Sequence, residues 1–350
     1  MWIAITMAAA LLGGLLFQKI RVPAGLLLGA VVAVAALNIA SGKANVWPQA
    51  RVLSQIISGA YLGGMITKDE LRLLPRITGP FVVIFFGFLA LNIGAALLIS
   101  NLTQLSLISC LFSAMPGGIS DAPLIAMDMG ADVAAVTILQ FIRVIFGLGC
   151  LPWLICLADK SGKGGAARVA KEESTALKAM GKTHRTAFIP YIPALCIGSA
   201  AGLLGRISGV AAGTISFSML AVAMLNIYGK AGAMPDWLRN AAQVLCGCCI
   251  GIRVGPEQIR NLPQLILPAG ILCAGYLLLC IFGGYMISKV FKFRFKEAML
   301  FLAPAGAVEM SFIAADMGIN SPALALLQMF RLMSVVLLFP QIFYLVVYVL

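Results

Sequence analysis

The sequence predicts an all-α polytopic membrane protein built from two homologous repeats. Of its 350 residues, 61% are hydrophobic and only 11% are charged, whereas typical soluble chains carry about 25% charged residues. Apolar runs of membrane-spanning length recur from end to end, so we expect about 10–12 transmembrane segments. The second half also repeats the first. These observations predict a multi-pass protein of the inner (plasma) membrane.

Hydropathy places six apolar segments in each half of the chain. In the first half they lie near residues 2–17, 24–40, 49–67, 77–101, 105–129 and 132–158. In the second half they lie near residues 188–205, 209–228, 234–254, 262–288, 298–317 and 321–348. The chain therefore divides into a membrane repeat over 1–158, a basic hydrophilic connector over 159–187 and a second membrane repeat over 188–350.

A constant offset of 188 positions relates the two halves. The matched pairs include Leu37–Ile39 with Leu225–Ile227, Gln55 with Gln243, Pro116 with Pro304, Asp128 with Asp316, and Arg143 with Arg331. The offset holds without a gap from Gly14 to Arg143, which chance does not explain. We interpret the chain as a duplicated membrane unit.

One apolar segment in each repeat is interrupted at the same place. The interrupting residues are Pro116, Gly117 and Gly118 in the first copy, and Pro304 and Gly306 in the second. Such residues free backbone groups, which are costly in lipid unless protein or water satisfies them. Discontinuous helices at matching positions of two repeats indicate the substrate site of a transporter. We expect one broken, crossover-type helix per repeat; a purely structural kink is the alternative.

A carboxylate follows each interruption at the same aligned position, Asp121 in the first repeat and Glu309 in the second. Ionisable groups inside spanning segments are costly and are functional candidates by default. Each could take up a proton near neutral pH, or hold a sodium ion together with freed carbonyl oxygens. The structural alternative is that each carboxylate caps the N-terminus of the following half-helix.

An arginine lies near the middle of the last segment of each repeat, Arg143 and Arg331, with Gln140 and Gln328 three residues earlier on the same helical face. The guanidinium group presents a planar fork of donors, which suits a carboxylate or another anion. The alternative is an internal ion pair with one of the acids, namely Asp128, Asp316, Asp121 or Glu309. Both roles are compatible if the substrate displaces the partner.

Two further matched polar pairs lie inside apolar segments, Asn38 with Asn226 and Gln55 with Gln243. Such side chains either line a cavity or form hydrogen bonds between helices. The sequence leaves both roles open.

The topology of the repeats contains a conflict. Six crossings per unit make the repeats parallel, and five make them inverted. The connector is basic and should be cytoplasmic, and so should Lys68, Arg72 and Arg76. Three full crossings from those residues nevertheless place the connector outside. We infer that one segment does not cross fully; the short first pair of each repeat is a candidate, although its removal does not by itself resolve the conflict.

The motifs resemble those of the AbrB-type family of duplicated membrane proteins. They are RVPAGLLLGA at Arg21–Ala30, PGG at Pro116–Gly118, and GAD at Gly130–Asp132 followed by Gln140 and Arg143; the second copy has PAG and Asn320 instead. The resemblance covers essentially the whole chain. This family is similar to the group of cation/proton antiporters, bile acid symporters and auxin efflux carriers. The resemblance implies two broken helices that cross at mid-membrane, in a core that moves against a panel.

Two activities attached to this family can be tested against the residues. Regulation of gene expression by direct DNA binding is not expected, because the connector is too short for a DNA-binding domain; an indirect effect stays open. A copper monooxygenase needs imidazole-rich ligation, and His184 is the only histidine. We therefore expect no enzyme activity, no metal site and no organic cofactor, and leave a sodium ion or a proton open.

The expected function is secondary transport of a small organic anion, coupled to a proton or sodium, by alternating access of the core against the panel. The anion would bind where the interrupted helices meet, near Arg143 or Arg331, with Asp121 or Glu309 as the coupling group. The expected partners are this anion and the lipid bilayer, and a homodimer stays open. The alternative is a membrane sensor or regulatory protein that uses the same pocket without net transport.

Overall fold

The structure, a computed structural model, describes residues 1–20, 24–66, 68–158, 191–228, 234–260, 262–304 and 322–349. Over these ranges the regular secondary structure is entirely helical, which confirms the predicted all-α class. Four helical stretches there are long and apolar enough to cross a membrane: Trp2–Lys19, Ile77–Leu102, Leu262–Phe291 and Leu326–Tyr348. The connector, Gly306, Glu309 and Asp316 lie outside the described residues.

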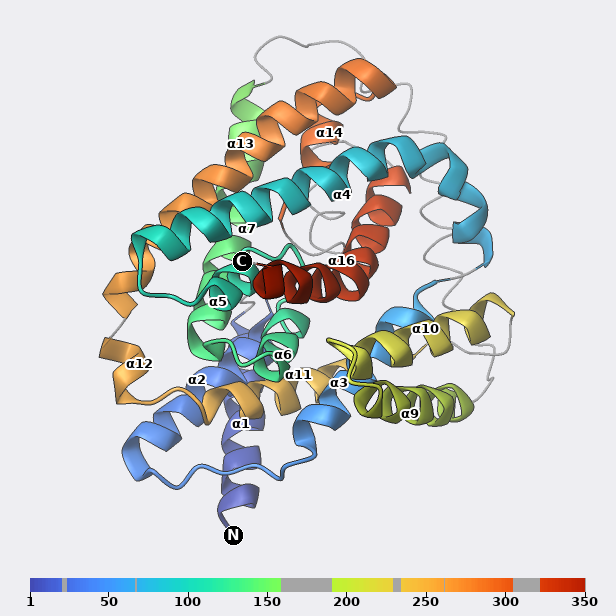
Figure 1. Cartoon of the computed structure of the whole chain (residues 1–350). Helices are drawn as coiled ribbons and strands as arrows, with labels where there is room; N and C mark the ends of the chain where they lie inside the picture. The colour runs from blue at the N-terminus through green and yellow to red at the C-terminus, as the bar shows by residue number, and fades with distance from the viewer. Residues whose placement is uncertain are drawn as a thin grey trace.

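The helices follow the offset seen in the sequence (Figure 1). The first half contains α1 (Trp2–Lys19), α2 (Gly25–Ser41), α3 (Ala50–Gly64), α4 (Lys68–Leu102), α5 (Leu107–Ser113), α6 (Asp121–Asp128) and α7 (Val133–Ala158). The second contains α9 (Tyr191–Ile207), α10 (Gly213–Ile227), α11 (Asp236–Gly251), α12 (Pro256–Arg260), the 3-10 helix η1 (Leu262–Leu265), α13 (Ile266–Phe291), α14 (Phe295–Phe301) and α16 (Pro322–Val349). Both ends of α14 lie 188 positions after those of α5.

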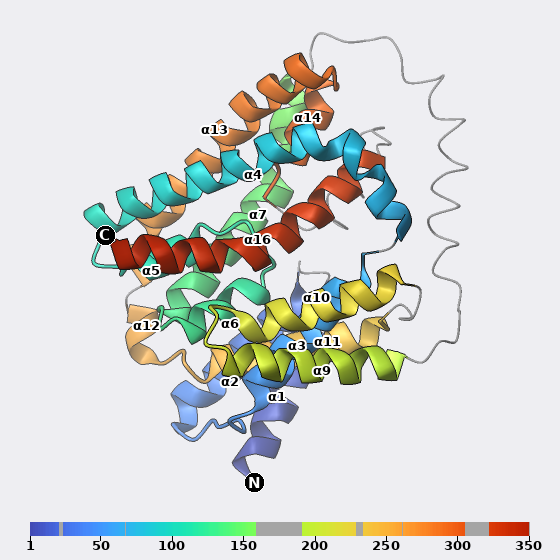
Figure 2. The ribbon, with the colours of Figure 1, turned by 45° about the vertical axis from the view of Figure 1, so that its right-hand side comes forward.

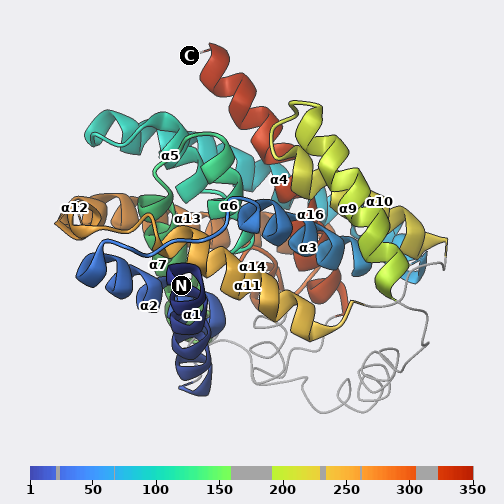
Figure 3. The same cartoon turned by 90° about the horizontal axis from the view of Figure 1, so that it is seen from below.

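The helices pack as two bodies, each of which takes helices from both halves of the chain (Figure 2). The panel body consists of α1, α2, α3, α9, α10 and α11, and the core body consists of α4, α5, α6, α7, α13, α14 and α16. Contacts between the bodies are sparse and run mainly through α3 with α6, α10 with α16, and α11 with α7. Seen from below, the panel body lies in front of the core body (Figure 3).

Within the panel body the two halves exchange matched hydrogen bonds. Asn38 of α2 donates through its Nδ2 to the carbonyl oxygen of Ile252 after α11, at 3.0 Å. The matched Asn226 of α10 donates to the matched carbonyl of Gly64, at the end of α3, at 2.7 Å. Of the two roles left open by the sequence, both asparagines therefore have the interhelical one, which stabilises the panel body.

Matched glycines allow the same helices to approach closely. A Cβ at Gly63 of α3 would collide with the carbonyl oxygen of Met219 of α10. A Cβ at the matched Gly251 of α11 would lie 2.9 Å from the carbonyl oxygen of Val31 of α2. Small residues at such positions let membrane helices pack backbone against backbone. The panel body is thus a tightly packed, pseudo-symmetric unit.

The interrupted segment of the first repeat folds back on itself as a hairpin, and the predicted crossover-type arrangement is not confirmed for this repeat. The backbone N–H of Asp132, which follows α6, donates to Oγ of Ser109 in the first turn of α5, at 2.8 Å. The outer ends of α5 and α6 therefore lie together, and the chain reverses at Pro116–Gly118. Asp132 also caps α7, because its Oδ1 accepts from the N–H groups of Ala134 and Ala135.

Candidate functional site

Two side chains of α7 donate hydrogen bonds to the backbone carbonyl oxygens at the C-terminal end of α5. Gln140 donates through its Nε2 to the carbonyl oxygens of Phe112 and Met115, at 2.7 and 3.0 Å. Arg143 donates to the carbonyl oxygens of Met115 and Gly117, the latter at 3.0 Å. Both side chains are buried. A buried cation at this place donates to the last carbonyl oxygens of the helix, which have no partner within the helix. It is also attracted by the negative end of the helix dipole.

The second repeat shows the same contacts at α14. Gln328 of α16 donates to the carbonyl oxygen of Leu300 at 2.8 Å, and Arg331 donates to that of Ala303 at 2.7 Å. Both acceptors lie 188 positions after those of the first repeat, and both donors are buried. The Gln–Arg faces that the sequence singled out for anion binding thus contact freed backbone carbonyls. Pro304, also buried, follows directly.

The structure brings the two arginines together in the centre of the core body. The hydroxyl of Tyr276 in α13 donates to the carbonyl oxygen of Ala114 at 2.7 Å, and both Arg143 and Arg331 lie near this hydroxyl. The guanidinium of Arg331 also stacks over the ring of Phe88 in α4, 5.3 Å from its centroid. This polar centre holds the broken ends of α5 and α14 inside an apolar body.

Asp121 lies at the inner end of the hairpin. It is the first residue of α6 and is 5% exposed. Its carboxylate folds back over Gly118, where a Cβ would collide with Oδ2. Oγ of Ser120 donates to it at 3.4 Å, and Ser58 of α3 lies beside it. The helix dipole stabilises a carboxylate in the first turn, but Ser120 is the N-cap of α6 and no side chain forms a capping hydrogen bond there. Gly118 leaves space for the carboxylate.

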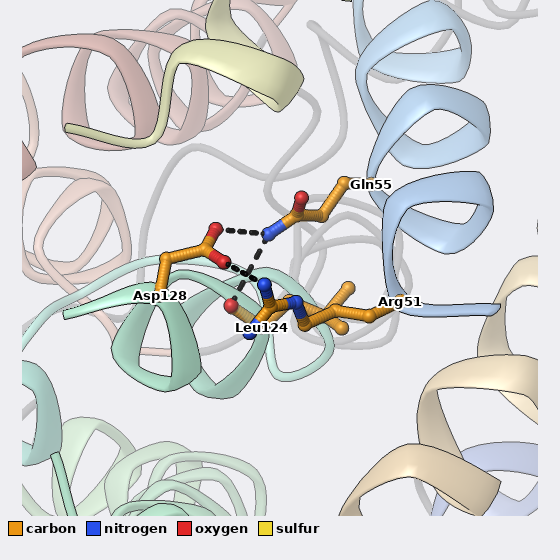
Figure 4. A network of polar contacts seen from close by, with 4 residues as sticks. All are labelled: Arg51, Gln55, Leu124 and Asp128. Carbon is orange, nitrogen blue, oxygen red and sulfur yellow. Dashed lines mark hydrogen bonds and ion pairs between the residues drawn. The ribbon is translucent and has the colours of Figure 1, made fainter. Parts of the chain in front are cut away.

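Asp128, at the C-terminal end of α6, forms an ion pair with Arg51 of α3 and not with Arg143 (Figure 4). Nη2 of Arg51 lies 2.9 Å from Oδ1 of Asp128. Nε2 of Gln55 donates to Oδ2 of Asp128 at 2.5 Å and to the carbonyl oxygen of Leu124 at 3.2 Å. The internal ion pair between Arg143 and Asp128, left open by the sequence, is therefore not formed. The network instead bridges the panel body and the core body.

A cavity of about 760 Å³ lies beside this network, at the junction of the two bodies. Its charged lining residues are Arg51, Arg206 and Asp128, and Tyr344 and Tyr348 of α16 also line it. The turn between α9 and α10 and the outer ends of the hairpin complete its wall. Of the predicted site residues, Asp121, Gln140, Arg143, Gln328 and Arg331 do not line this cavity.

Sequence reasoning missed both arginines of the cavity. Arg51 lies one helical turn before Gln55, and its counterpart at the offset of 188 is Arg239. Arg51 is therefore an identical matched position in the two repeats, as Gln55 is, and could have been found in the same way. Arg206 aligns with Gln18, so the repeat gives no indication of it, and only the fold places it at the cavity.

Comparison with known proteins shows the family of the chain. The model of the family described as "Transition state regulatory protein AbrB" matches residues 1–159 and again 161–347. The chain belongs to the AbrB family. It is 24% identical over 341 residues to the Escherichia coli (strain K12) protein named "Putative regulator AbrB", covering 93% of this chain and 91% of that protein.

A second relative from this comparison is the Bacillus subtilis (strain 168) protein named "Uncharacterized protein YhjN". It is 22% identical to this chain over 299 residues, which cover 83% of this chain and 77% of that protein. Both alignments extend over most of the two proteins compared. The AbrB resemblance drawn from the motifs is thereby confirmed.

Proposed function

We propose that this AbrB-family chain is a secondary transporter of the plasma membrane that moves a small organic anion. The observation that carries the proposal is the cavity at the junction of the panel and core bodies, with Arg51 and Arg206 in its wall. Its volume of about 760 Å³ lies in the usual range for small-molecule sites. A guanidinium group presents a fork of donors that matches a carboxylate.

Movement of the core body against the panel body would provide alternating access. Each body is tied internally by matched hydrogen bonds between its helices. Between the bodies the structure has few contacts, among them the Arg51–Asp128 pair and a hydrogen bond of 2.5 Å from Gln341 of α16 to the carbonyl oxygen of Ala211. Two bodies joined by few helix–helix contacts, which include apolar packing as well as these polar pairs, suit rocking of one body against the other around a site between them.

The hairpin supports an inverted topology for the two repeats. With α5 and α6 entering and leaving on one side, the crossing helices of the first repeat are α1, α2, α3, α4 and α7, an odd number. The residues Lys68, Arg72 and Arg76 at the start of α4 and the connector 159–187 then share a side, which removes the conflict in the sequence. Their basic character makes that side cytoplasmic, and the cavity then faces the external side.

Transport is tested in proteoliposomes that contain the purified full chain. A panel of carboxylates is offered under imposed proton and sodium gradients, with a pH-sensitive dye inside the vesicles. We expect carboxylate-dependent flux with wild type and unchanged flux with Arg253→Gln, a change at an exposed arginine away from the cavity. The double variant Asp121→Asn with Glu309→Gln tests whether the carboxylates beside the interruptions carry the coupling ion.

The second candidate function is a membrane sensor or regulatory protein that uses the same cavity without net transport. The name "Putative regulator AbrB" of the Escherichia coli relative favours it. An effect on gene expression would then be indirect, and we propose neither enzyme activity nor direct nucleic-acid binding. A carboxylate that raises the unfolding temperature of the chain but is not transported by it would favour the sensor over the transporter.

A further inference from the structure

We propose that Arg51 is the anion-binding group of the cavity and that Asp128 is the proton carrier. During transport Arg51 exchanges one partner, Asp128, for another, the substrate. The substrate carboxylate replaces Asp128 on the guanidinium of Arg51, while Asp128 takes up the co-transported proton. This inference rests on the proposed function, because it assigns the substrate class and the coupling ion of the same cavity.

The exposure of the pair places it at the cavity wall. The side chains of Arg51 and Asp128 are 31% and 26% exposed, so water and a small solute reach both groups. Arg143, by contrast, is 2% exposed and its terminal nitrogens contact backbone carbonyls. Of Arg51 and Arg143, it is therefore Arg51 whose partner an incoming carboxylate can replace without removing a donor from a helix end.

The charges around Asp128 favour a second anion. Arg51 on α3 and Arg206 on α9 both lie near the carboxylate, and the described residues show no carboxylate paired with Arg206. The other titratable groups lining the cavity are the hydroxyls of Tyr344 and Tyr348. The charged lining thus carries two cations against one anion, and neutralising Asp128 leaves an excess of two positive charges for the substrate.

The exchange balances in protons and charge. A proton from the aqueous phase in the cavity binds the carboxylate of Asp128, and the ion pair with Arg51 ends. The substrate carboxylate then pairs with Arg51, while Gln55 stays within reach of the neutral Asp128 and of Leu124. On the other side the substrate and the proton leave, and the Arg51–Asp128 pair forms again. One proton therefore accompanies each substrate molecule that is carried, because the described lining of the cavity has a single carboxylate, that of Asp128, to hold it.

This exchange also explains why both ligands would be required for movement. The Arg51–Asp128 pair joins α3 of the panel body to α6 of the core body, so it opposes their separation. Protonation of Asp128 alone would leave the cation of Arg51 unpaired, which becomes unfavourable when movement of the bodies buries it. Proton and carboxylate together remove the bridge and satisfy the arginine, so the loaded protein moves.

The test measures carboxylate flux and proton uptake together in proteoliposomes, with acetate, lactate, succinate and benzoate as probes. Arg51→Gln should lower the flux about 10- to 100-fold, because a charge-assisted pair with the substrate is lost. Asp128→Asn should keep exchange of labelled for unlabelled carboxylate, but lose proton uptake and the dependence of exchange on pH. The matched controls Arg253→Gln and Asp236→Asn, both at exposed positions, should behave as wild type.

Each outcome separates this inference from the proposed function. Wild-type flux with Arg51→Gln, or proton uptake retained in Asp128→Asn, would overturn the inference and leave transport standing. Loss of proton uptake only in Asp121→Asn with Glu309→Gln would overturn it as well. If Asp128→Asn does not fold, the ratio measured with wild type decides, since anything other than one proton per substrate molecule contradicts the exchange. If wild type transports none of the probes, the proposed transport function itself is contradicted.

Discussion

At the scale of the residue, burial separates two kinds of arginine in this protein. Arg143 and Arg331 are buried in the core body and donate to carbonyl oxygens at interrupted helix ends. Arg51 stands at the cavity and pairs with a carboxylate. An arginine in a membrane segment is a functional candidate by default, but a nearby break in a helix supplies acceptors that such a cation can satisfy.

We predict that Arg143→Gln lowers the stability of the chain by about 1–3 kcal/mol, because the carbonyl of Gly117 and a helix end lose a charged donor. Thermal unfolding in detergent measures the effect, without added carboxylate. Arg253→Gln, at an exposed position, should change stability by less than about 0.5 kcal/mol. Equal unfolding temperatures for Arg143→Gln and wild type would contradict the structural role of Arg143.

At the scale of the element, the panel body depends on helices that pack backbone against backbone. α3 packs on α10 and α2 packs on α11, with matched asparagine contacts and matched glycines at both interfaces. Such interfaces have no room for extra atoms, whereas helices at the lipid surface do. The effect of one added methyl group should therefore depend on which helix face carries it.

We predict that Gly63→Ala destabilises the chain by about 1–3 kcal/mol, because its Cβ would collide with the backbone of Met219 and force α3 away from α10. Gly94→Ala in α4 is the matched control, since a Cβ there has no neighbour within 4 Å. Thermal unfolding of both variants in the same detergent checks the difference. A Gly63→Ala protein as stable as Gly94→Ala would show that α3 and α10 pack less closely than described.

At the scale of the whole molecule, the two halves of the chain are shared between two bodies. The first three helices of each half build the panel body, and the later helices build the core body. In Figure 2 the C-terminal end of α4, the turn between α9 and α10 and the C terminus lie at the same end of the molecule. This arrangement makes both the sidedness of the chain and the movement of the bodies testable.

For sidedness, we predict that the connector is cytoplasmic and the turn between α9 and α10 is external, because the basic segments share one side. A fluorescent protein inserted within 159–187 should therefore be fluorescent in cells. Alkaline phosphatase inserted at Gly209 in the turn should be active. An inactive phosphatase at Gly209 beside a fluorescent connector would contradict the inverted topology.

For movement, we predict that a short dithiol cross-linker between Ala211→Cys and Gln341→Cys stops transport, because it joins the panel body to the core body where Gln341 now donates to Ala211. The nine native cysteines are replaced first, and reduction should restore flux. A cross-link between Ser54→Cys and Ala242→Cys is the control, since both residues belong to the panel body and lie in hydrogen-bond contact.

A monofunctional reagent on each single cysteine distinguishes a blocked cavity from a blocked movement. If modification of Ala211→Cys alone stops flux, the cross-link carries no information about movement. If only the cross-link stops flux, the bodies move against each other. Undiminished flux with the cross-link in place would contradict alternating access by these two bodies.

The helical class, the limits of most segments, the duplication and the place of the first interruption follow from the sequence. These properties are carried locally, by composition and by apolar runs, or by an offset that can be read along the chain. The offset also placed Gln140 with Arg143, and Gln328 with Arg331, as equivalent pairs, and the helices α5 and α14 follow it residue for residue.

The direction of the chain after Pro116–Gly118 and the partner of each charged side chain became known from the folded structure. A break frees the backbone but does not orient it; the contact of Asp132 with Ser109 closes the hairpin. Asp128 and Gln55 meet across 73 positions of sequence, on helices of different bodies. Local patterns specify helices, whereas long-range packing specifies which charged side chains face one another, so the cavity could be found only in the folded chain.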